Sequence, residues 1–189
     1  MKLLVRTALV GTLAAVAGTQ AQAQAGLTSS VQQVQINATK NPVLSVVINS
    51  GGTQTLASLT DNAVNDFSTP VNVTTTWDVG PGAASVALVG YFTTPAQALS
   101  NVTAGTFITS SLMKGAVNGG AYNAFTGNAV GAVGSAGGSL TIFSQTTPNA
   151  ASRNSNRTDN LALRLDLTGQ PALVPGTYSG TLNLAAVTQ

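Results

Sequence analysis

Apolar and polar residues alternate along most of the chain, which is the pattern of β-strands with one buried face. In TDNLALRLDLTG, leucine occupies every second position from Leu161 to Leu167, with polar residues and one alanine between. Further strands are predicted at VLSVVIN, VNVTTTWDV, ASVALVGYF and SLTIFSQ, and less clearly at SSVQQVQINA, TQTLAS and TFITS. The turn DVGPGAAS predicts that VNVTTTWDV and ASVALVGYF form an antiparallel pair with Trp77 in the core.

The chain ends in another alternating segment, PGTYSGTLNLAAVTQ. Tyr178, Leu182, Leu184 and Ala186 share one phase, whereas the residues between them are mostly polar. This predicts a half-buried strand from 178 to 188. Nothing follows it in the sequence, so the strand is either central in its own sheet or an edge that meets another subunit.

Many short strands, frequent Gly and Pro turns and no helical periodicity predict an all-β fold. We expect a single antiparallel β-sandwich, immunoglobulin-like or pilin-like, with eight or nine strands. Tyr178 follows a Gly and Pro turn, so it either forms a tyrosine corner or caps one end of the core. Both interpretations make Tyr178 structural.

The first 25 residues match a secretory signal peptide. Lys2 and Arg6 precede the apolar run TALVGTLAAVA, which is shorter than the roughly 20 residues of a membrane anchor. The small-residue pattern predicts cleavage after residue 23 or 25, which leaves residues 26–189 as one domain. The mature protein is therefore expected in the periplasm, on the cell surface or outside the cell, without membrane insertion.

Composition excludes most functional chemistry. Of seven basic residues two lie in the signal peptide, so five remain against five acidic ones and the net charge is zero. Binding to nucleic acid, which needs clustered Lys and Arg, is not expected. The chain has no His, Cys or Glu, which excludes triads, thiol catalysis, histidine metal sites and paired-Glu glycosidases. We predict no catalytic residues, cofactor or metal, and interpret Asp61 and Asp66 as part of a polar turn rather than a calcium site.

Two segments remain candidates for binding. Residues 115–139 are rich in glycine and predict a long surface loop or a hairpin with a loose tip, where Tyr122 and Phe125 could contact a ligand. TTPNAASRNSNRTDN predicts a polar loop, in which Arg153 and Arg157 could bind an anion or a sugar carboxylate. The alternative, which we favour, is that these arginines are solvated and paired to nearby Asp.

Several segments resemble a type of small secreted bacterial β-sandwich of unknown function, and the ending also resembles spore coat protein U and chaperone-usher pilin-like domains. The resemblance is carried by VTTTWDVGPGAASVALVGYF, LTIFSQ, RTDNLALRLDL and LVPGTYSGTLNLAAVTQ. The closing motif appears here as Gly176, Thr177, Tyr178, Gly180, Thr181, Leu182 and Leu184. Many pilins and coat U domains carry a disulfide, whereas this chain has no cysteine. The resemblance implies an exported structural subunit and no catalytic residues.

In pilin-like proteins an extended segment of a neighbour completes a sandwich that lacks one strand. The corresponding segment here is GLTSSVQQVQINA, but Val31 lies on one phase and Val34 and Ile36 on the other. This favours the interpretation that the segment is the first strand of its own domain.

Edge strands are commonly guarded by Lys, inward-pointing charges or Pro. The mature chain has only Lys40 and Lys114, neither inside a confident strand. We therefore predict a noncatalytic structural protein that assembles with copies of itself through strand edges, as a cell-surface or filament subunit. The alternative is a monomeric extracellular module that binds a glycan or another ligand through the glycine-rich loop or Trp77.

Overall fold

The computed structural model describes residues 30–189. The predicted signal peptide and its cleavage sites lie outside these residues. Lys40–Gln189 forms one compact unit, and residues 30–39 do not belong to it. Residues 30–39 contain no helix or strand and all are exposed, so the strand predicted at SSVQQVQINA is not formed there.

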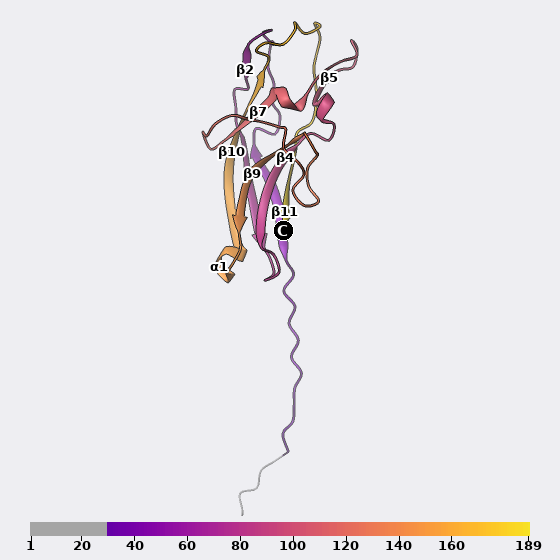
Figure 1. Ribbon diagram of the computed structural model, residues 1–189. Helices are drawn as coiled ribbons and strands as arrows, with labels where there is room; N and C mark the ends of the chain where they lie inside the picture. Colours follow the sequence, from indigo (N-terminus) through magenta and orange to yellow (C-terminus); the bar gives the residue numbers. More distant parts are fainter. Residues whose placement is uncertain (1–29) are drawn as a thin grey trace, which may run out of the picture. The chain divides into compact units, whose positions relative to one another are not determined.

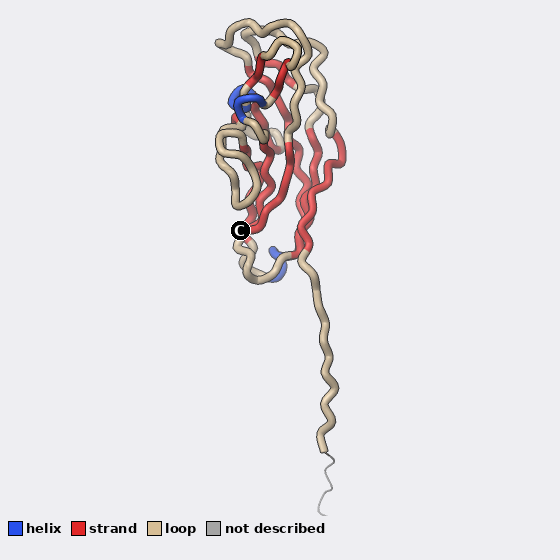
Figure 2. Tube along the Cα trace, turned by 90° about the vertical axis from the view of Figure 1, so that its right-hand side faces the viewer, coloured by secondary structure: helices blue, strands red, loops and turns tan. Residues whose placement is uncertain are grey.

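Residues 40–189 fold as an antiparallel β-sandwich, whose two layers of strands are visible in Figure 2. The larger sheet has the order β1-β3-β10-β7-β8, and β2 also pairs with β10. Its strands are β1 (Val43–Ser50), β2 (Val64–Asp66), β3 (Val71–Asp78), β7 (Met113–Val117), β8 (Asn123–Ala124) and β10 (Asn154–Asp166).

The smaller sheet has the order β11-β4-β9 (Figure 1). Its strands are β4 (Ser85–Tyr91), β9 (Ser139–Thr146) and β11 (Asn183–Thr188). A separate two-stranded sheet and three single-turn helices lie in the connections: β5 (Leu99–Asn101), β6 (Thr106–Ile108), η1 (Pro95–Gln97), η2 (Ser110–Leu112) and α1 (Ala150–Arg153). Within residues 30–189, no helix has the length and apolar character needed to span a membrane.

The core lies between the two sheets and is built from the alternating positions. The leucines from Leu161 to Leu167 are all buried, as is Trp77. The indole Nε1 of Trp77 donates a hydrogen bond to the carbonyl oxygen of Ser152 (2.9 Å), and its ring lies 6.0 Å from that of Phe143. The prediction that Trp77 is a core residue is confirmed.

Two sequence predictions are wrong, one about strand pairing and one about a loop. VNVTTTWDV and ASVALVGYF do not pair, because β3 and β4 lie in different sheets and the turn between them carries the chain across the sandwich. The polar segment TTPNAASRNSNRTDN is not a loop: it contains α1, capped by Asn149, and the first half of β10. Arg157 and Asp159 occupy inward positions of this strand, so both faces of its first half carry polar residues.

The closing strand β11 is shorter than predicted and is an edge. It pairs with β4 on one side, and among the described residues no strand pairs with its other side. On the same side of the sandwich, β1 is the edge of the larger sheet and lies next to β11. The segment TQTLAS, which follows β1, forms no strand.

The segment before β11 is fixed against the β5-β6 sheet. The hydroxyl of Tyr178 donates to the carbonyl oxygen of Val174 (3.1 Å), four residues upstream, as in a tyrosine corner. It also lies 2.8 Å from the hydroxyl of Thr106. A Cβ atom at Gly180 would overlap the carbonyl oxygen of Ala98, which explains the glycine in the closing motif.

Candidate functional site

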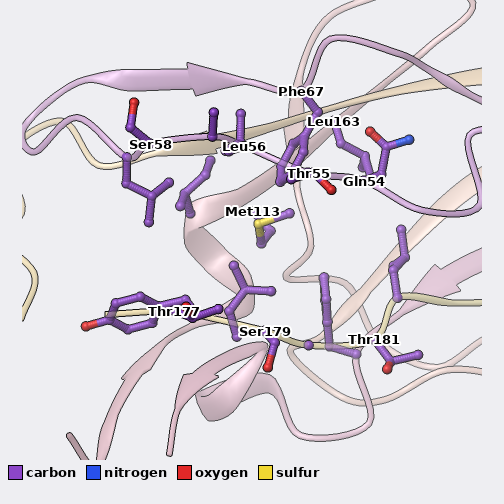
Figure 3. A pocket seen from close by; sticks show the side chains of 18 of the residues that line it. Gln54, Thr55, Leu56, Ser58, Phe67, Met113, Leu163, Thr177, Ser179 and Thr181 are labelled. Atoms are coloured by element: carbon purple, nitrogen blue, oxygen red, sulfur yellow. The ribbon is translucent and has the colours of Figure 1, made fainter. Parts of the chain in front are cut away.

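A groove of about 810 Å³ opens on the side of the sandwich where β1 and β11 form the two edges. One wall contains residues 51–59, which follow β1, and the opposite wall contains residues 173–182, which precede β11 (Figure 3). Because neither segment forms a strand, no ladder of backbone hydrogen bonds joins the two walls.

The floor of the groove is the core itself. Phe67, Val71, Met113, Leu163 and Leu165 line it, and these residues come from β3, β7, β10 and the connection after β2. In Figure 3 the Met113 side chain lies between the two walls. Except for the half-buried Phe67, these floor residues are at most 5% exposed, so the groove ends against the packed core.

The two strand edges beside the groove carry no charged residue. On β1, Leu44 and Ile48 are 38% and 47% exposed although they lie on the inward phase with Val46. On the outward phase, Val43 and Val47 are 47% and 55% exposed. A long, uncharged and apolar edge strand is a surface that readily pairs with another strand.

The end of the groove is fixed by side chains of the turn after residue 60. Asp61 Oδ1 accepts a hydrogen bond from the backbone N–H of Leu173 (3.0 Å). Asn62 Oδ1 accepts one from the backbone N–H of Gly169 (2.6 Å). Among the described lining residues Asp61 is the only charged one, and its carboxylate holds the two walls in place.

The carboxylates of Asp61 and Asp66 have different partners. Asp66 accepts a hydrogen bond from Arg164 Nε (2.8 Å) across the β2-β10 pair, on the outer face of the larger sheet. Within residues 30–189 no three carboxylate, His or Cys side chains gather as a metal site would require. The turn is polar, and its side chains Asp61 and Asn62 accept hydrogen bonds from the opposite groove wall and the residues before it.

The residues predicted for the closing strand all lie on this side. Tyr178, Leu182 and Leu184 line the groove, and Ala186 packs with them against the core. The groove could not be predicted from the sequence, because its other wall, residues 51–59, includes TQTLAS, whose pattern predicts a strand.

The four residues predicted in the two candidate binding segments do not come together. The ring of Tyr122 lies 3.5 Å from the Arg164 guanidinium on the outer face of the larger sheet. Phe125 is completely buried against Phe92. Arg153 ends α1, and Arg157 binds Asp159 on β10.

The outer face of the larger sheet also carries an ion pair that shifts a pKa. Lys114 Nζ lies 2.6 Å from Asp166 Oδ2 across the β7-β10 pair. Hydrogen bonds from Lys114, and then from Thr168, lower the pKa of the Asp166 carboxyl to about 2. This pair belongs to the surface and not to the groove.

No protein-family model matches the chain, and a search of curated proteins finds no significant match. The function must therefore be argued from the groove and the strand edges.

Proposed function

We propose that this protein is a noncatalytic, exported structural subunit that assembles with copies of itself through strand edges, with the groove accepting an extended segment of a second copy. The observation that carries the proposal is a groove with mixed polar and apolar walls, whose floor is formed by apolar core residues and which lies between two uncharged strand edges. The signal-peptide pattern and the pilin-like closing motif support export and a role as a cell-surface or filament subunit.

An occupant of this groove must be extended and must present apolar side chains. A segment extended through the groove could form backbone hydrogen bonds with residues 51–59 or 173–182, which form no strand, and its apolar side chains on one face would pack against the floor. Charged ligands fit poorly, because the floor is apolar and Asp61 already binds a backbone N–H.

The chain itself contains a segment of this kind. Residues 30–39 form no strand, and Val31, Val34 and Ile36 are 85%, 84% and 85% exposed. Val34, Ile36 and Ala38 lie on one phase, so in a strand their side chains would project from the same face at a spacing of about 6.6 Å. Ten extended residues span about 33 Å, more than the roughly 26 Å of an eight-residue strand such as β1.

A binding module for glycans is the second interpretation, and the burial of Trp77 and Phe125 argues against it. Sugars commonly stack on exposed rings, yet Trp77 and Phe125 are completely buried. Neither ring is available as a binding platform.

A pair of matched substitutions tests the proposal. Ile36→Asp places a charge on the apolar phase of the segment, and Gln35→Asp places the same charge on the opposite phase. Both residues are exposed, so neither change should alter the unfolding temperature. Light scattering over a concentration series, with negative-stain images, should show growth of large species for the wild type and for Gln35→Asp, and monomers for Ile36→Asp.

Two results would overturn the proposal. A wild-type protein that stays monomeric at every concentration would show that the edges are not used between subunits. Equal assembly of the wild type and Ile36→Asp would show that this segment is not the occupant of the groove.

A further inference from the structure

The sandwich has a second open side, opposite β1 and β11. In the smaller sheet β9 is the edge, and beyond Ser139, which bridges to Gly127, no described strand pairs with its outer side. In the larger sheet β7 pairs with β10 only at residues 161–165, so residues 154–160 of β10 also lack a strand partner on that side. Figure 1 shows β9 and β10 next to each other on this side.

The interior behind these two edges contains a charged pair. Asp159 has a completely buried side chain, and Arg157 Nε donates to both of its carboxylate oxygens at 2.9 Å. Asn118 Nδ2 donates to Asp159 Oδ1 at 2.7 Å. The Arg157 guanidinium lies 4.9 Å from the centre of the Phe143 ring, which belongs to β9 in the opposite sheet. The arginine therefore bridges the space between the two unpaired edges.

The two open sides thus differ in one respect. On the β1/β11 side the inward positions are apolar and partly exposed, as at Leu44 and Ile48. On the β9/β10 side the inward positions of β10 are Arg157 and Asp159, and the guanidinium covers Phe143. Inward-pointing charges are a known means of keeping an edge from pairing with another chain.

We infer that the Arg157–Asp159 pair is an edge guard, which prevents the β9/β10 side from accepting a strand and leaves each subunit with one accepting side. An apolar strand docked there would remove the partly exposed guanidinium from water without offering it a new partner, which is unfavourable. One accepting side per subunit gives a linear, head-to-tail assembly, whereas two would give branching. This inference rests on the proposed function for the identity of the docking strand.

The test counts strand-binding sites with a synthetic peptide of residues 26–39. The full chain carries Ile36→Asp, so that its own segment does not compete. Native mass spectrometry should find one peptide per chain. Adding Arg157→Met with Asp159→Asn neutralises the pair together, which avoids an unpaired buried charge and retains an acceptor for Asn118. We expect two peptides per chain for this variant.

The control is Lys114→Met with Asp166→Asn, which removes a Lys–Asp pair of the same net charge from the outer face. It should leave the count at one. If the number of bound peptides per chain does not rise in the Arg157/Asp159 variant, the inference of an edge guard is wrong, whatever the effect on stability. If the proposed function itself is wrong, the result differs: the chain with an intact Arg157–Asp159 pair would bind no peptide.

If the Met-containing variant does not fold, as judged by Trp77 fluorescence, Arg157→Gln with Asp159→Asn replaces it, because both new side chains remain polar. The count should again rise by one, with weaker binding at the second site. An unchanged count in this folded variant would equally overturn the guard.

Discussion

Replacement of Phe125 by alanine tests whether the glycine-rich segment is part of the core. The ring is completely buried and meets Phe92 edge to face, with centroids 5.3 Å apart and planes at 77°. It also fills the space above two glycines, Gly90 of β4 and Gly115 of β7, where a Cβ atom would lie 3.2 and 3.4 Å from it. Phe125 thus joins the two sheets at one end of the sandwich.

Phe→Ala changes in cores cost about 3–5 kcal/mol, and about 0.5–1.5 kcal/mol of this is typical for an aromatic pair. Because both glycines lack side chains that could close the cavity, we expect about 4 kcal/mol. Domains are stable by only about 5–15 kcal/mol, so the variant should remain folded but marginal. With a urea m-value of about 2 kcal/mol/M, the unfolding midpoint should fall by about 2 M.

The assay is urea unfolding followed by the fluorescence of Trp77, the single tryptophan. It is done with Ile36→Asp present, so that assembly does not contribute to stability. Tyr122→Ala, three residues earlier but on the outer face beside Arg164, is the control and should cost about 1 kcal/mol or less. A loss below about 1 kcal/mol for Phe125→Ala would refute the placement of the ring in the core.

Three further predictions concern the closing segment and the surface. Gly180→Ala should lower the free energy of unfolding by about 1–3 kcal/mol, because the new Cβ would meet the backbone oxygen of Ala98, which cannot rotate away. An unchanged unfolding temperature would contradict this packing. Asn183→Lys adds a charge to the β11 edge and removes an amide that donates to the Tyr91 carbonyl oxygen (3.4 Å) and the Thr93 hydroxyl (3.2 Å), so the monomer should stay folded with a loss of about 1 kcal/mol at most, and assembly in light scattering should decrease; undiminished polymerisation would mean that this edge is not used between subunits. The pKa of Asp166 is lowered from 3.8 to about 2, so its stabilising effect is complete above about pH 4 and lost as the pH falls towards 2. Lys114→Met should flatten the acid unfolding profile in that range at low salt, and a profile identical to that of the wild type would show that the pair contributes nothing.

The strands that could be predicted from the sequence are those whose buried face is apolar. The leucines of β10 and the Val and Trp positions of β3 alternate with polar residues, and β3 and the leucine half of β10 form where predicted. The first half of β10 was missed because Arg157 and Asp159 occupy its inward positions, and polar residues on both faces of a strand look like a loop. The pairing of β3 with β4 was wrong because a turn sequence does not reveal whether the chain stays in one sheet.

The groove and the burial of the Phe125 ring could not be predicted from the sequence, for a different reason. Phe125 stands in a segment whose glycines predict a loop, and the space for its ring is created by Gly90 and Gly115, which meet only after the sheets have formed. The groove exists because residues 51–59 and 173–182 do not form strands, although the first contains a segment with the composition of one. Which strands become edges depends on sheet order, and hydrophobic periodicity carries no information about that order.

The most direct test of the central claim is a crosslinking experiment between two distinguishable copies. A photoreactive benzophenone side chain replaces Ile36 in one copy, which is mixed with an isotopically labelled wild-type copy and irradiated. Mass spectrometry of the crosslinked peptides should identify residues of the labelled copy that line the groove, such as Ile48, Leu56 or Leu182. Crosslinks confined to one chain, or to the labelled copy outside the groove, would contradict assembly through this site.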